Sequence, residues 1–218
     1  YRIAARRLAE ILAEFSPDQV RPVHVAQIQT SFEETPAVAN RTVTVLRLLF
    51  DRALKAGYIE SNPCTGIRPV PIKARDRLLT WAEYKAIHAK AGERLRVIME
   101  LCVLTGQRIG DVLAIRRADL TDEGIAFQQA KTGKRLIVAW SPELRRAVER
   151  AKALTPGFVP MTLFYGKANQ PPGYKIIWHQ WKRACKAAGV ANANIHDLRA
   201  LSGTEADRQG IDAQALLG

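Results

Sequence analysis

The sequence has little of what marks a secreted, metal-stabilised or membrane-embedded protein. Its 218 residues include three cysteines, an odd number, and no C-x-x-C pair. The four histidines show no metal-ligand spacing, no apolar run approaches the length of a membrane span, and no signal-peptide pattern opens the chain. Cys102 and Cys185 fall on apolar faces of helical segments, which favours packing roles over ligand roles. We therefore expect a protein of a reducing compartment that neither binds a metal nor enters a membrane.

Acidic residues are also scarce. The chain has 21 Asp and Glu against 33 Lys and Arg, which gives a formal net charge of +12 and a pI of about 10.0. The excess is present in both parts of the chain, with 11 basic and 7 acidic residues in 1–75 and 22 and 14 in 76–218. Such a charge favours a nucleic-acid partner that contacts both parts of the molecule. The alternative is a soluble protein that is basic without binding nucleic acid.

The first part of the chain has the pattern of a small helical unit. Apolar residues of 3–15 recur on one helical stripe, and a short apolar-patterned segment follows at Val23–Ile28. Thr35-Pro36 then reads as an N-cap and first helical residue of a helix that stops at Gly57. We predict a helical DNA-binding domain over residues 1–61. Its Arg41 and Arg47 are candidate phosphate contacts, although solvated arginines are the simpler alternative.

The next stretch is punctuated by proline and glycine. Residues 62–77 contain Asn62-Pro63 and two further prolines, and they end in three basic residues, Lys73, Arg75 and Arg77. Proline removes a backbone donor and fixes φ, so helix or central strand is disfavoured here. We predict a basic interdomain linker that either lies along DNA or is solvated.

Residues 78–218 predict a larger domain, mostly helical with a small sheet. Thr80-Trp81-Ala82-Glu83 is a capping-box pattern, and residues 95–103 carry a buried helical stripe. Between residues 119 and 140 the period changes to that of strands, and two apolar triplets flank Lys131-Thr132-Gly133-Lys134 as in a β-hairpin. Further helices are expected over 141–154 and 177–188, with Leu163-Phe164-Tyr165 as a candidate short strand. The predicted fold class is mainly α with a small antiparallel β-sheet.

Three stretches of this domain carry groups suited to a phosphate. Arg108 follows the glycine turn at Thr105-Gly106 and begins a helix, with Asp111 three residues later able to orient it. Lys131 is an ammonium at the hairpin tip. His196 and Arg199 are three apart and would share one helical face. Two guanidinium forks can neutralise a phosphodiester, a lysine among cations can acquire a lowered pKa and protonate a leaving oxygen, and histidine can donate or accept a proton.

In order and spacing, the segments T-G-x-R-x-x-[DE], K-T-G and H-x-L-R resemble those of the tyrosine recombinases, the phage-integrase family of site-specific DNA recombinases. The resemblance covers nearly the whole chain and implies a core-binding domain followed by a catalytic domain. It implies that Arg108, Lys131, His196 and Arg199 are catalytic and that Asp111 supports the first arginine. Lys134 is a less suitable alternative to Lys131 and a candidate DNA contact. The family cleaves and rejoins double-stranded DNA through a 3′-phosphotyrosyl link, without a cofactor or a metal.

The family's pattern continues past Leu216-Leu217-Gly218 with a histidine, a His/Trp position and the nucleophilic tyrosine, none of which is in this sequence. We therefore expect this polypeptide to bind DNA without cleaving it. The resemblance implies that the complete protein is an integrase acting as a homo-tetramer on paired sites. Such a protein would be bacterial or phage-encoded, cytoplasmic and associated with the nucleoid. The alternatives are a type IB topoisomerase-like enzyme and a non-catalytic DNA-binding regulator.

Overall fold

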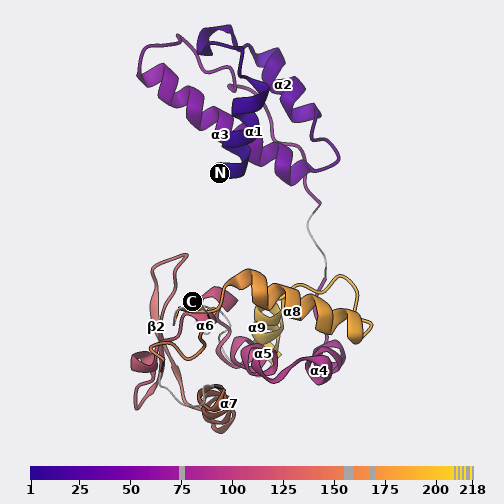
Figure 1. Ribbon diagram of the computed structural model, residues 1–218, viewed down its shortest axis with the longest axis vertical. Coiled ribbons are helices and arrows are strands. Elements are labelled where there is room, and N and C mark those ends of the chain that lie inside the picture. Colours follow the sequence, from indigo (N-terminus) through magenta and orange to yellow (C-terminus); the bar gives the residue numbers. More distant parts are fainter. Residues whose placement is uncertain are drawn as a thin grey trace. The chain divides into compact units, whose positions relative to one another are not determined.

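The computed structural model describes residues 1–73, 77–154, 160–166 and 170–208, together with residues 210, 212, 214 and 217. The chain divides into two units, Tyr1–Asp76 and Arg77–Gly218 (Figure 1). Each unit has a hydrophobic core of its own. The described residues are mainly helical, with one small antiparallel sheet in the second unit, so the predicted fold class is confirmed.

The described residues of the first unit form a bundle of three α-helices. They are α1 (Arg2–Ile11), α2 (Pro22–Thr30) and α3 (Pro36–Lys55). Thr35 precedes α3 and Pro36 begins it, as the sequence predicts, and Gly57 follows it with φ +77°. Val43, Leu46 and Phe50 recur at helical spacing along α3 and are buried against α1 and α2. The apolar-patterned segment at Val23–Ile28 lies within α2.

The stretch predicted as a linker is in large part packed on the first unit. Asn62 donates through Nδ2 to Asp51 Oδ1 at 2.7 Å, and the Val70 amide donates to Asn40 Oδ1 at 2.7 Å. Cys64 is fully buried in the core of this unit. Polar side chains of α3 thus form hydrogen bonds with a proline-rich segment that forms no helix or sheet. The first unit therefore extends beyond residue 61.

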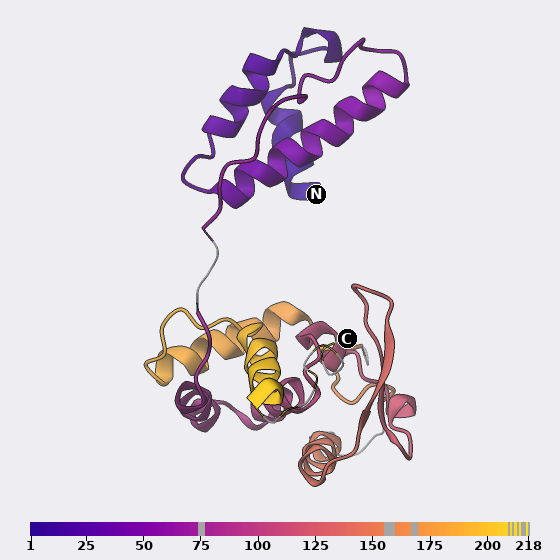
Figure 2. The same ribbon diagram turned by 180° about the vertical axis from the view of Figure 1, so that it is seen from behind.

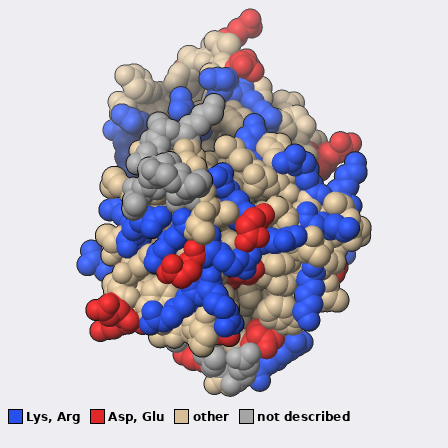
Figure 3. Space-filling model, turned by 60° about the horizontal axis from the view of Figure 1, so that its bottom comes forward, with Lys and Arg blue, Asp and Glu red and all other residues tan. Residues whose placement is uncertain are grey.

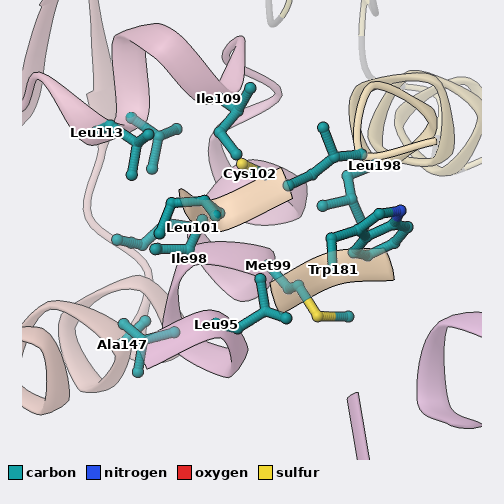
Figure 4. Close-up of a cluster of buried hydrophobic side chains, with 14 of the residues drawn as sticks. Leu95, Ile98, Met99, Leu101, Cys102, Ile109, Leu113, Ala147, Trp181 and Leu198 are labelled. Atoms are coloured by element: carbon teal, nitrogen blue, oxygen red, sulfur yellow. The ribbon is translucent and has the colours of Figure 1, made fainter. Parts of the chain in front are cut away.

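The second unit is arranged around α5. Its α-helices are α4 (Trp81–Lys90), α5 (Glu93–Thr105), α6 (Ile109–Leu113), α7 (Pro142–Ala153), α8 (Tyr174–Ala187) and α9 (Asp197–Arg208). Each of the other helices in this set contacts α5. Leu95, Ile98, Met99, Leu101 and Cys102 of α5 lie at the centre of the core (Figure 4). The stripe predicted over 95–103 is therefore buried, except that its last residue, Val103, is half-buried. Val97 and Leu101 are also buried, so α5 is covered on more than one face.

Local patterns in this unit form largely as expected. The Thr80 hydroxyl accepts the Glu83 amide hydrogen at 3.2 Å and Glu83 Oε2 accepts that of Thr80 at 3.0 Å, which completes the capping box. Strands β1 (Gly124–Gln128) and β2 (Arg135–Ala139) pair antiparallel, and the hairpin lies beside α6 (Figure 2). The strand expected at 163–165 is absent among the described residues, where a single bridge pairs Arg116 with Thr162.

In the part of the chain that the structure describes, no helix is both long enough and apolar enough to cross a membrane.

Candidate active site

The site begins at the glycine turn that ends α5. Gly106 adopts φ +64°, a left-handed conformation that favours glycine and terminates the helix. Gln107 follows and is fully buried; its amide nitrogen Nε2 donates to the Thr105 carbonyl at 3.1 Å. The turn places Arg108 directly before α6, with its side chain 22% exposed.

Asp111 connects α6 with the hairpin loop. Its Oδ1 accepts the amide hydrogen of Ala130 at 3.0 Å, and its Oδ2 lies 4.0 Å from Arg108 Nη1. The carboxylate is 5% exposed. Asp111 thus lies where a residue that supports Arg108 electrostatically should be, although 4.0 Å is too long for a hydrogen bond.

The loop between β1 and β2 carries Lys131 and reaches Arg108. The Gln129 amide donates to the Lys134 carbonyl at 2.9 Å, and Gly133 turns the chain with φ +71°. Lys131 and Lys134 are both exposed in this loop. Arg108 Nη1 donates to the side-chain oxygen Oε1 of Gln129 at 3.0 Å, so the loop and the arginine are in direct contact.

His196 and Arg199 come from the start of α9. The Asn194 amide donates to Asp197 Oδ2 at 2.8 Å, which caps the helix that begins at Asp197. His196 therefore precedes the helix, so the prediction of one shared helical face is wrong for it; the residue is exposed. Leu198, between the two, is fully buried in the core.

Arg199 binds the glycine turn that precedes Arg108. Its Nη1 donates to the Gly106 carbonyl at 2.8 Å, and its Nη2 donates to the Leu217 carbonyl at 2.8 Å. Burial lowers the pKa of Arg199, and the positive charge of Arg108 lowers it further, while Asp111 raises it. Two guanidinium groups therefore lie within each other's field, an arrangement that an anion between or beside them would stabilise.

Two of the predicted DNA contacts already hold parts of the protein. Arg47 Nη2 donates to the carbonyls of Cys64 and Ile67, at 3.2 and 3.0 Å, and so holds the segment after α3. Arg77 forms an ion pair with Glu83 at 2.9 Å. These contacts give both arginines a structural role within their own units.

Three of the other predicted DNA contacts lie at the surface. Arg41 on α3, Lys73 and Lys134 are exposed, and Arg75 lies outside the described residues. On the face drawn in Figure 3, Lys and Arg side chains are spread much more widely than Asp and Glu. The positive charge that the sequence predicts is therefore displayed at the surface.

The cysteines are packing residues, as predicted for Cys102 and Cys185. Both are buried free thiols, and so is Cys64. Burial raises the pKa of Cys102 to about 12. Among the described residues, no group of three His, Cys, Asp or Glu side chains could hold a metal ion.

Sequence reasoning missed the two glutamines of the site, Gln107 and Gln129, which are fully buried and hydrogen-bonded to each other at 2.8 Å. For Gln129 a signal exists. Ile125 and Phe127 are buried in alternation along β1, and Gln129 continues the alternation one residue past its end, so a polar residue there had to be buried and partnered. For Gln107 the sequence offers no comparable periodicity.

Comparisons with known proteins show the family to which the chain belongs. The model of the phage integrase family matches residues 74–217. The integrase of Enterobacteria phage 434 is 29% identical over 185 residues, which cover 78% of this chain and 51% of the phage protein. This chain thus spans about half the length of that relative.

Solved structures share the fold. A lambda integrase dimer bound to a COC′ core site has a TM-score of 0.85 at 24% identity, covering 100% of this chain and 86% of that one. A lambda integrase tetramer bound to a Holliday junction has a TM-score of 0.83 at 24% identity, covering 99% of this chain and 70% of that one.

Proposed function

This chain belongs to the phage integrase family, and from that membership we propose that the complete protein is a site-specific DNA recombinase. It binds duplex DNA and cuts and rejoins strands through a 3′-phosphotyrosyl intermediate. The similarity to a lambda integrase tetramer on a Holliday junction supports a homo-tetramer on paired DNA sites as the working assembly. The nucleophile is proposed to be a tyrosine, at the position that the family's pattern gives it after the H-x-L-R segment.

The observation that carries the proposal is the meeting of Arg108 and Arg199 at one turn. Arg199 donates to the Gly106 carbonyl. Arg108, two residues later, directly precedes α6 and contacts the hairpin loop. A phosphodiester under attack gathers negative charge on its non-bridging oxygens, and two guanidinium groups that stay protonated at neutral pH can stabilise it. Loss of one such preorganised donor typically costs ~10²–10³ in rate.

The reaction balances without an external energy source. The tyrosine hydroxyl gives up its proton as its oxygen bonds to phosphorus, the bond from phosphorus to the 5′ oxygen breaks, and the leaving oxygen takes a proton. Lys131, exposed in the hairpin loop, is proposed to supply that proton. His196 is proposed to accept the proton that the tyrosine loses, or to form a hydrogen bond with the phosphate. A 5′-hydroxyl of the partner strand reverses each step, so one phosphodiester is exchanged for another.

DNA contacts outside the phosphate site are assigned to exposed basic residues. Arg41, Lys73 and Lys134 are exposed, whereas Arg47 and Arg77 are engaged within the protein. We propose the first three as phosphate contacts. Alanine substitution of any one of them should reduce the salt slope of DNA binding by about 0.9.

The test compares arginine variants on a DNA site selected by affinity from a randomised duplex pool. A nicked form of that duplex traps the covalent product, because the short strand diffuses away after cleavage. We expect the complete protein to form a covalent complex, and Arg108→Ala and Arg199→Ala to lower its rate by roughly 10²–10³. Arg146→Ala, a surface arginine on α7, is the matched control and should have no effect.

The rival functions predict different outcomes. A topoisomerase-like enzyme would relax supercoiled DNA lacking the selected site, and a DNA-binding regulator would bind without any covalent product. Either result would refute the proposal.

A further inference from the structure

Gln129 uses every hydrogen-bonding group of its side-chain amide inside the protein. Its Oε1 accepts from Arg108 Nη1 at 3.0 Å and from Thr132 Oγ1 at 2.7 Å. Its Nε2 donates to Gln107 Oε1 at 2.8 Å and to the Leu217 carbonyl at 2.7 Å. The residue is fully buried, so its amide cannot form hydrogen bonds with solvent. These four protein groups satisfy it instead.

These partners fix the orientation of the amide. Arg108 is a donor only, so it requires an oxygen opposite it, and the Leu217 carbonyl is an acceptor only, so it requires the NH₂ group. A flipped amide would face both with the wrong group. Gln107, itself buried and bound to the Thr105 carbonyl, holds the NH₂ end to the glycine turn.

An amide oxygen suits this position for an electrostatic reason. It accepts a hydrogen bond from the Arg108 guanidinium without cancelling its charge, which stays available for a phosphate. Asp111 carries the opposite charge but lies 4.0 Å away. Gln129 therefore orients Arg108, while Asp111 acts on it at longer range.

The same oxygen also holds the loop that presents Lys131. Thr132, which follows Lys131 in the sequence, donates to Gln129 Oε1, the same oxygen that accepts from Arg108. We infer that Gln129 is a positioning residue. It holds Arg108 and the Lys131 loop in a fixed position relative to each other, so that Arg108 and Lys131 act on the same phosphate. This inference rests on the proposed function and adds to it a residue that contacts no DNA.

The test measures single-turnover cleavage and DNA affinity separately, in the complete protein. Gln129→Leu should lower the cleavage rate about 100-fold, the order expected when a catalytic group is misplaced by about 1 Å. DNA affinity should change less than about threefold, because the charges that set it are retained. Gln128→Leu, the exposed neighbour on the opposite face of β1, is the matched control and should leave both quantities unchanged.

A sulfur substitution separates positioning from general damage. A substrate with sulfur at the 5′-bridging position releases a thiolate, which needs no proton from Lys131. Thr132→Val, which loosens only the loop, should regain the wild-type rate on this substrate. Gln129→Leu should regain only part of its loss, because Arg108 is still misplaced. Merely structural damage would affect both substrates equally.

The outcomes decide between the two proposals. If the wild-type protein forms no covalent complex, the proposed function fails. If it cleaves and Gln129→Leu cleaves equally fast, or if sulfur restores neither variant, the positioning role is refuted. Thr132→Val alters an exposed loop residue and decides the question should Gln129→Leu fail to fold.

Discussion

Leu198→Ala is the sharpest test of how the second unit holds Arg199 in place. Leu198 lies between His196 and Arg199, and its side chain is fully buried in the same core as Trp181 and Cys102 (Figure 4). The substitution keeps the charged residues of the motif and removes only the apolar anchor. Its effect therefore measures the packing that fixes α9 on α5.

The magnitude follows from complete burial. Leucine to alanine in a packed core typically costs about 2–5 kcal/mol, made up of lost transfer free energy and the remaining cavity. We expect roughly 3 kcal/mol here, because Leu198 is fully buried within the core of the second unit, which leaves little room to collapse. With a urea m-value of about 2 kcal/mol/M, the unfolding midpoint should fall by about 1.5 M.

Tryptophan fluorescence isolates the relevant transition. All four tryptophans, at positions 81, 140, 178 and 181, belong to the second unit, so their emission reports its unfolding and not that of the first. Leu78→Ala, at a leucine that is 61% exposed, is the control and should shift the midpoint by less than about 0.3 M. A shift for Leu198→Ala no larger than that of the control would refute the reasoning.

Three further predictions concern other parts of the second unit. Cys102, whose thiol pKa burial raises to about 12, should resist a disulfide reagent at about pH 8 until urea unfolds the protein; fast labelling of the folded protein would contradict this. Gly124→Ala should lower the unfolding free energy by about 1–3 kcal/mol, because a Cβ there would collide with the Val138 carbonyl in the paired strand. The pKa of Glu83 is held low, first by the Thr80 amide, so its contribution to stability is complete above the ordinary glutamate pKa of about 4.3 and is lost as pH falls through the lower folded value. Glu83→Gln keeps the capping box without the titrating charge, so the unfolding free energy of this variant should fall less steeply as the pH is lowered. An unchanged dependence on pH would exclude Glu83 as a cause of the acid sensitivity.

Much of the fold could be predicted because it depends on neighbours in sequence. The α3 start at Thr35-Pro36, the capping box at Thr80 and the hairpin on either side of Gly133 are set by backbone geometry and period within a few residues. The candidate site residues Arg108 and Lys131 could be found for a related reason. Their spacing matches the motifs of the phage integrase family, and their types suit a chemistry that needs fixed positive charge and a proton donor at a phosphate.

Contacts between distant segments were decided by the tertiary structure alone. Arg47 looks in sequence like a free phosphate contact, yet it donates to two carbonyls 17 and 20 residues further along the chain. Residues 62–70 resemble a linker because their proline pattern excludes regular structure, but the pattern cannot reveal that Asn40 and Asp51 satisfy their backbone and side-chain groups.

The sequence by itself determined which groups are present, how the helices and the hairpin form, and the family. The tertiary structure alone decided that Arg199 reaches the Gly106 carbonyl, 93 residues away, and that Gln129 meets Gln107 and Arg108 in one network. The physical reason is that periodicity reports burial of one face, whereas a hydrogen bond depends on two atoms meeting within about 3 Å at the right angle. That meeting is fixed by how α5, α6, α9 and the hairpin pack together.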